Sequence, residues 1–107
     1  VVFDAVTSNC PNPGNSCSPN ASFNVADVVK GSTGSIYQIK FRQNFSNRNY
    51  AVVGMSQLTG AGVSPLVNVA GTASADAYGL NSVNITITTA ATYINATKVS
   101  ILIFGEQ

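Results

Sequence analysis

The stretch that decides the fold is Ile36–Gly54, which reads IYQIKFRQNFSNRNYAVVG. In its first part apolar and polar residues alternate, in the order Tyr37, Gln38, Ile39, Lys40, Phe41 and Arg42. A period of two is the spacing of side chains on a strand whose two faces meet different surroundings. The segment NFSNRN that follows is rich in Asn, which tolerates the backbone angles of turns. The stretch therefore predicts a β-hairpin in which Tyr37, Ile39 and Phe41 face a core.

The same stretch holds three of the five basic residues of the chain, Lys40, Arg42 and Arg48, close to aromatic residues. Such interleaving also occurs in nucleic-acid-binding surfaces. On a strand, however, Lys40 and Arg42 project from the face opposite to the aromatic rings, so they do not form one patch with them. The net charge of +1 is also too small for an electrostatic grip on DNA or RNA. We therefore expect no nucleic-acid partner.

Period-two alternation recurs along the whole chain and is clearest at Val83, Ile85 and Ile87. Seven strands are predicted, at about 1–7, 22–29, 35–42, 49–57, 63–70, 82–89 and 97–104. Stretches rich in Gly, Pro, Asn and Ser separate them, and no segment of a dozen residues carries a helical stripe. These patterns predict one domain, 1–107, of the all-β class: a single antiparallel β-sandwich of jelly-roll-like form.

The last predicted strand is apolar on both faces, because Leu102 and Phe104 occupy positions that are polar in the other strands. This pattern predicts burial on both faces, either between sheets or against a neighbouring subunit. Only 8% of the residues are charged, compared with roughly 25% in an average soluble domain. So few charges favour a surface that partners cover. The alternative is a small domain kept soluble by Asn, Ser and Thr.

The sequence offers no local motif for catalysis. It has no His, which removes Ser-His-Asp and Cys-His catalysis and most zinc sites. The four acidic residues, Asp4, Asp27, Asp76 and Glu106, lie far apart along the chain. We therefore predict that the protein is not an enzyme and uses no cofactor or metal. No apolar run approaches the roughly 18 residues of a membrane span, so no membrane insertion is expected.

Cys10 and Cys17 are the only cysteines, and the stretch between them, PNPGNS, consists of turn-forming residues. The two thiols can therefore approach each other at the base of a loop. We predict a disulfide that pins this loop, as extracellular exposure favours. The alternative is two reduced thiols.

Several short motifs of the chain occur together: SFNVADV at 22–28, YQIKF at 37–41, NYAVVG at 49–54, VNITI at 83–87 and VSILIFG at 99–105. This set resembles a module that recurs in virion proteins of tailed bacteriophages, especially near the C-terminal ends of tail fibres. The resemblance spans nearly all of the chain from residue 22 onward. The two-cysteine loop and the middle section, 58–81, depart from the pattern of the module.

The resemblance implies a tail-fibre terminal module on the surface of the virion, at the C-terminal part of a longer chain. It further implies a homotrimer that contacts other virion proteins, with host recognition in variable loops. The candidate loops are 58–62 and 72–81, where Asp76 and Tyr78 suit contact with a host glycan or protein. Phe45, at a loop tip, either caps the core or touches a neighbour, and Arg48 in the same loop is a further candidate contact.

Three other functions fit the same features. The module can sit on the capsid, as a decoration or head-fibre protein. The chain can be an extracellular filament or pilus-like subunit whose last strand, 97–107, completes the sheet of a neighbour. It can also be a lectin-like carbohydrate-binding module. Copy number per particle, the pairing of the last strand and glycan binding distinguish these alternatives from the tail fibre.

Overall fold

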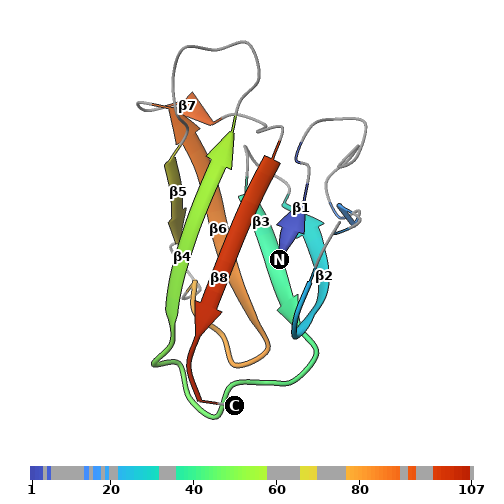
Figure 1. Ribbon diagram of the computed structural model, residues 1–107, viewed down its shortest axis with the longest axis vertical. Coiled ribbons are helices and arrows are strands. Elements are labelled where there is room, and N and C mark those ends of the chain that lie inside the picture. Colours follow the sequence, from blue (N-terminus) through green and yellow to red (C-terminus); the bar gives the residue numbers. More distant parts are fainter. Residues whose placement is uncertain are drawn as a thin grey trace.

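The computed structural model is built from β-strands (Figure 1). It describes residues 1–3, 5, 14, 16–17, 19, 22–31, 36–57, 66–69, 77–89, 92–93 and 98–106. The strands are β1 (Val2–Phe3), β2 (Val25–Lys30), β3 (Ile36–Phe41), β4 (Ala51–Gln57), β5 (Leu66–Val69), β6 (Ser82–Thr89), β7 (Thr92–Tyr93) and β8 (Lys98–Phe104). Each predicted strand is present, and β7 is an additional short strand in a stretch predicted as a turn. The described part of the chain has no helix long and apolar enough to cross a membrane.

The strands form two antiparallel sheets (Figure 1). Sheet A has the order β1-β8-β4, and sheet B has the order β2-β3-β6-β5, with β7 paired to the end of β6. Strands β4 and β5 contact each other across the two sheets. The prediction of an all-β, antiparallel sandwich is confirmed.

The predicted hairpin over Ile36–Gly54 is wrong, because its two strands belong to different sheets. β3 pairs with β2 and β6, whereas β4 pairs with β8. The connection, 42–50, is long enough to cross from sheet B to sheet A, and it places Phe45 in the core. Asn24 holds its start: the Gln43 N–H donates to Asn24 Oδ1 at 2.8 Å, and Asn24 Nδ2 donates to the Gln43 carbonyl at 3.1 Å.

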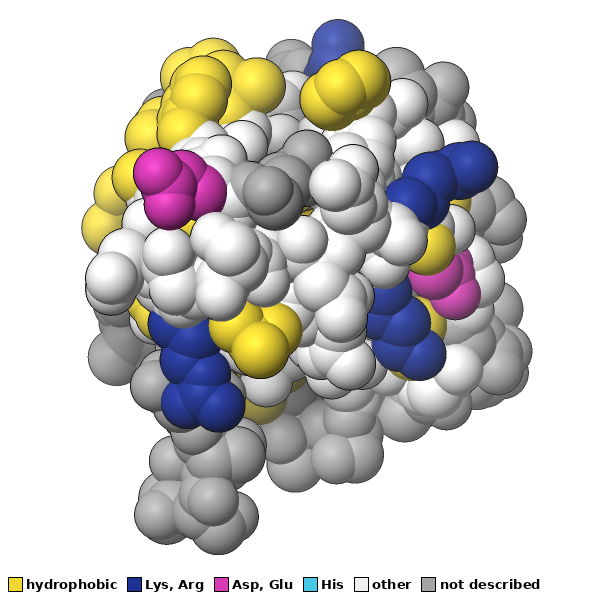
Figure 2. Space-filling view, turned by 90° about the horizontal axis from the view of Figure 1, so that it is seen from below, with side chains coloured by type: hydrophobic (Ala, Val, Ile, Leu, Met, Phe, Trp, Pro, Cys, Tyr) yellow, Lys and Arg dark blue, Asp and Glu magenta, His cyan; other side chains and the backbone are white. Residues whose placement is uncertain are grey.

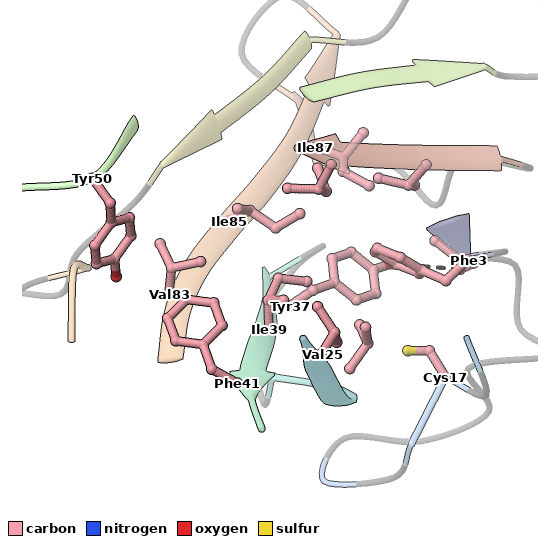
Figure 3. Close-up of a cluster of buried hydrophobic side chains, with 14 of the residues drawn as sticks. Phe3, Cys17, Val25, Tyr37, Ile39, Phe41, Tyr50, Val83, Ile85 and Ile87 are labelled. Atoms are coloured by element: carbon pink, nitrogen blue, oxygen red, sulfur yellow. Dashed lines mark hydrogen bonds between the residues drawn. The ribbon is translucent and has the colours of Figure 1, made fainter. Parts of the chain in front are cut away.

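The core lies between the sheets and contains the inward residues of β3 and β6 (Figure 3). Tyr37, Ile39 and Phe41 are buried as predicted, since alternate side chains of a strand share a face. The Tyr37 ring lies 5.4 Å from the ring of Phe3 on β1, between centroids, and its hydroxyl donates to the Ala5 carbonyl at 3.4 Å. Sheet A and sheet B are therefore joined by a common aromatic contact.

Gly54 on β4 allows a close approach of the two sheets. A Cβ built at Gly54 would lie 2.6 Å from Val67 Cγ1 and 2.8 Å from Ile101 Cδ1. Real Cβ atoms do not come so close to other carbon atoms, so any larger residue requires its neighbours to shift. The glycine thus sets the separation of β4 from β5 at this point.

Candidate functional site

The outer face of sheet A is apolar. We call this surface the apolar face; its members are Ala51, Val53, Met55, Leu102 and Phe104. The fractional exposures are 53% for Val53, 72% for Met55 and 59% for both Leu102 and Phe104. In the ladder of β4 with β8, Val53 lies opposite Leu102 and Ala51 lies opposite Phe104. The large side chains therefore form neighbouring rows on one surface.

Alternation along the two strands explains this face. On β8, Val99 and Ile101 point into the core, so Leu102 and Phe104 must point away from it. The first predicted alternative, burial of both faces between sheets, is therefore wrong, because the chain buries one face and exposes the other. Burial of the exposed face against a neighbouring subunit stays a prediction. The stretch AVVGM in β4 carries the same sequence signal, an unbroken apolar run, and its exposed residues join the same surface.

Isolated apolar side chains are common on protein surfaces, but a contiguous group of large ones marks an interaction surface. The apolar face meets that description, because two paired strands contribute to it in register. Lys98 opposite Gln57 gives it a polar boundary at one end. An apolar surface of this kind suits contact with another apolar protein surface rather than with a charged ligand.

A groove of about 310 Å³ opens beside this face, at the edge of β8. Its lining is mostly apolar and comes from Val1, Phe23, Asn24, Val25, Phe41, Phe45 and Ile101–Gly105. Phe23 is 90% exposed, which is unusual for so large an apolar side chain. The groove and the apolar face share Leu102 and Phe104 and thus adjoin.

Phe45, a candidate contact residue, is buried at 5% exposure. Its ring stacks on Tyr50, with 4.5 Å between the centroids, and meets the edge of Phe41 at 4.9 Å. This is the core-capping position, one of its two predicted roles. What remains accessible of its side chain lies at the groove.

Tyr78 is half-buried, and its ring packs against Tyr50 with 5.0 Å between centroids. Phe45 and Tyr78 thus belong to one aromatic cluster around Tyr50, whose hydroxyl donates to the carbonyl of Gly79 at 2.8 Å. Arg48 is exposed in the connection between the sheets. The fourth candidate, Asp76, lies outside the described residues, as does loop 58–62. The structure therefore brings Phe45 and Tyr78 together, with packing as their evident role.

The acidic residues that the structure describes, Asp27 and Glu106, are not paired across a cleft. The Asp27 carboxylate accepts hydrogen bonds from the Ser16 hydroxyl at 2.5 Å and from the Val28 N–H at 2.8 Å, which fixes local structure. Within the described ranges, no three His, Cys, Asp or Glu residues are grouped closely enough to hold a metal ion.

Cys17 is fully buried and disulfide-bonded. Its predicted partner, Cys10, lies outside the described residues, so the pairing of these two remains a prediction. The Cys17 N–H donates to the Val28 carbonyl at 2.7 Å, which attaches this segment to the edge of β2.

Figure 2 shows one end of the molecule, where the Lys and Arg side chains lie apart and hydrophobic side chains gather along one edge. Lys40 is exposed between the buried Ile39 and Phe41 on β3, which places it on the outer face of sheet B, away from the core aromatics. The arrangement agrees with the sequence argument against a basic patch in Ile36–Gly54.

Comparison with known proteins finds no matching family model, no matching curated protein and no matching solved structure.

Proposed function

We propose that this chain is the terminal module of a bacteriophage tail fibre, a structural protein of the virion that assembles as a homotrimer and meets the host surface. The observation that carries the assembly part of the proposal is the apolar face, with four large side chains more than half exposed. The phage context is supported by the motifs at 22–28, 37–41, 49–54, 83–87 and 99–105.

Assembly through the apolar face removes these side chains from water, which stabilises a complex by roughly 25 cal/mol for each Å² of apolar surface buried. The low charge of the chain leaves little electrostatic repulsion between identical subunits. In a three-fold ring each chain contacts its two neighbours through different surfaces, so one apolar patch per chain is covered by both neighbours when it faces the three-fold axis. The other virion partner is the part of the fibre that carries the module.

Exchange of the last strand between subunits is the less favoured mode of assembly. β8 lies between β1 and β4 and pairs with both within its own sheet. A donated strand would have to replace the ladder with β4, which extends from Lys98 to Phe104. Contact between folded modules leaves that ladder intact, and for this reason we favour the fibre module over the filament subunit.

The assembly part is tested by sedimentation of the purified chain and of Leu102→Ser. The wild-type chain is expected to form a trimer. Leu102→Ser is expected to raise the dissociation constant of that trimer at least tenfold, which corresponds to about 1.4 kcal/mol. Leu66→Ser is the matched control, because Leu66 is 63% exposed and lies on β5 of the other sheet. A monomeric wild-type chain, or equal effects of both substitutions, would refute assembly through this face.

The virion part is tested on phage particles that carry an affinity tag on this chain. Electron microscopy of gold-labelled particles should place the label at the fibre tips, in a few tens of copies or fewer. Label spread over the capsid in hundreds of copies would identify a decoration protein. Absence of the chain from the particles would overturn the virion assignment, whatever the sedimentation result.

A further inference from the structure

The outer edge of β2 is covered by a short segment from earlier in the chain. β2 is the terminal strand of sheet B, with β3 on its other side. We call the covering residues Gly14, Ser16 and Cys17 the strap. The Cys17 N–H donates to the Val28 carbonyl, and the Gly14 N–H donates to the Lys30 carbonyl, both at 2.7 Å. The strap therefore binds β2 through the backbone, as a neighbouring strand would.

A side chain of β2 completes the cover. The Asp27 carboxylate accepts the Val28 N–H at 2.8 Å and the Ser16 hydroxyl at 2.5 Å. The N–H and the C=O of Val28 are thus both satisfied within the chain. An open row of such groups at the edge of a sheet is a template on which another chain can pair. The strap and Asp27 together remove this template.

The hold of the strap on β2 depends on Cys17. Gly14 and Ser16 are exposed, whereas Cys17 is fully buried, beside the core cluster, and disulfide-bonded (Figure 3). A dithiol can break this bond by thiol–disulfide exchange: both sulfurs become thiols, and the dithiol is oxidised to its own disulfide. Loss of the bond removes the covalent constraint on a segment that is otherwise attached mainly by hydrogen bonds.

The edge beneath the strap can pair with a second copy of itself. The strap bonds to Val28 and Lys30, so the backbone groups of these two residues point out of the sheet edge. Around a two-fold axis at Val29, Val28 lies opposite Lys30 of the second copy, and Val29 lies opposite its own counterpart. Ser16, which forms an antiparallel bridge with Val29, occupies the place of that counterpart. Such a contact is isologous and closes after two copies.

We propose that the strap is an edge guard held by the disulfide of Cys17, and that breaking this disulfide lets β2 pair with β2 of a second copy. Paired residues of an antiparallel ladder project on the same face, so the inward Val28 stays on the core side in this register. The net charge of +1 opposes the approach of two identical chains only weakly. The edge of sheet B is thus a latent interaction surface, separate from the apolar face of sheet A.

The test removes the disulfide without changing the strap. Cys10→Ser deletes the only other cysteine of the sequence and leaves Cys17 in place. Hydrogen exchange of the Gly14 and Cys17 amides should become at least tenfold faster than in the oxidised wild-type chain, while the amides of β3 stay protected. In sedimentation, the average mass should rise with concentration toward at least twice that of the oxidised chain. Wild-type chain treated with dithiothreitol should behave like Cys10→Ser.

A charge at the two-fold axis provides the control. Val29→Lys, added to Cys10→Ser, places like charges opposite each other and should abolish the rise in mass. Gln38→Lys is the matched variant, because Gln38 pairs with Val29 but lies on β3, away from the edge, and the rise should persist.

Three results would overturn the proposal. The first is an unchanged mass after loss of the disulfide, and the second is an equal rise in mass with Val29→Lys. The third is unfolding of the whole chain in Cys10→Ser, because the strap would then be needed for the fold itself. The oxidised chain is the reference throughout, so these results do not depend on whether it assembles through the apolar face.

Discussion

Substitution of Gly54 by Ala tests the close packing of sheet A on sheet B. Two effects oppose each other. Loss of backbone freedom in the unfolded chain stabilises the alanine variant by about 0.5–1 kcal/mol. Against this, the new methyl group would lie 2.6 Å from Val67 Cγ1, and overpacking of this kind costs about 1–3 kcal/mol. The net expectation is a loss of about 1–2 kcal/mol in the free energy of unfolding.

The neighbours of Gly54 determine how much of this cost can be relieved. Ile101 Cδ1 is the far end of a flexible side chain and can rotate away, whereas Val67 Cγ1 belongs to a β-branched side chain with restricted rotation. Removing that methyl group with Val67→Ala should therefore reduce the cost of Gly54→Ala. We expect a coupling of about 1 kcal/mol between the two positions.

Urea unfolding of the four proteins of this double-mutant cycle, followed by circular dichroism, measures both quantities. A similar slope in urea for all four would show that the same surface is exposed on unfolding. The reasoning is refuted if Gly54→Ala is as stable as the wild-type chain. It is also refuted if the loss is the same with Val and with Ala at position 67, since contact with Val67 would then contribute nothing.

Four further predictions concern the core, the amino terminus and the cysteines. Phe45→Ala should lower the free energy of unfolding by about 3 kcal/mol or more in urea titrations, because it removes a buried ring from the core. Tyr50→Phe should cost about 1 kcal/mol by the same assay, since it removes the hydroxyl whose single proton the Gly79 and Ser82 carbonyls share. The free energy of unfolding should rise with pH between the lowered pKa of the Val1 amine in the folded chain and its usual pKa of 8.0, because the unfolded chain binds that proton more tightly. Acetylation of the N-terminus should abolish this dependence on pH. Alkylation detected by mass spectrometry should modify Cys10 and Cys17 only after reduction, and reduction should cost about 2 kcal/mol if they close the predicted loop.

The sequence predicts the strands well because alternation is a local property. Val83, Ile85 and Ile87 are buried as their period of two indicates. The pairing of the strands cannot be predicted from alternation, because it depends on which sheet each connection leads to. Residues 42–50 are rich in turn formers, which suit a hairpin loop as well as a connection between two sheets. Within this stretch, Phe45 is the residue that distinguishes the connection from the hairpin loop. A loop that inserts a large aromatic side chain into the core cannot be a simple surface turn.

The candidate site was predictable only in part. An unbroken apolar run, such as ILIF at 101–104, predicts burial of both faces of a strand, but it does not say which face lacks a partner within the chain. That depends on the layer beneath the strand, which only the fold provides. The groove was not predictable at all, because its lining combines stretches that lie far apart in the sequence, around Asn24, Phe41 and Ile103, and only the fold brings them together.

The antiparallel pairing of β1 with β8 directs the start of β1 and the end of β8 toward the same end of the molecule. Since β1 runs toward Val99 and β8 runs away from it, chain that is joined before Val1 leaves in the same direction as chain that follows Gly105 (Figure 1). The connection 42–50 lies at this end too, where the Ser46 N–H donates to the Glu106 carbonyl at 2.9 Å. A fusion partner at either terminus therefore extends toward the end of the molecule that holds this connection. The opposite end, where β4 finishes at Gln57, faces away from both points of fusion.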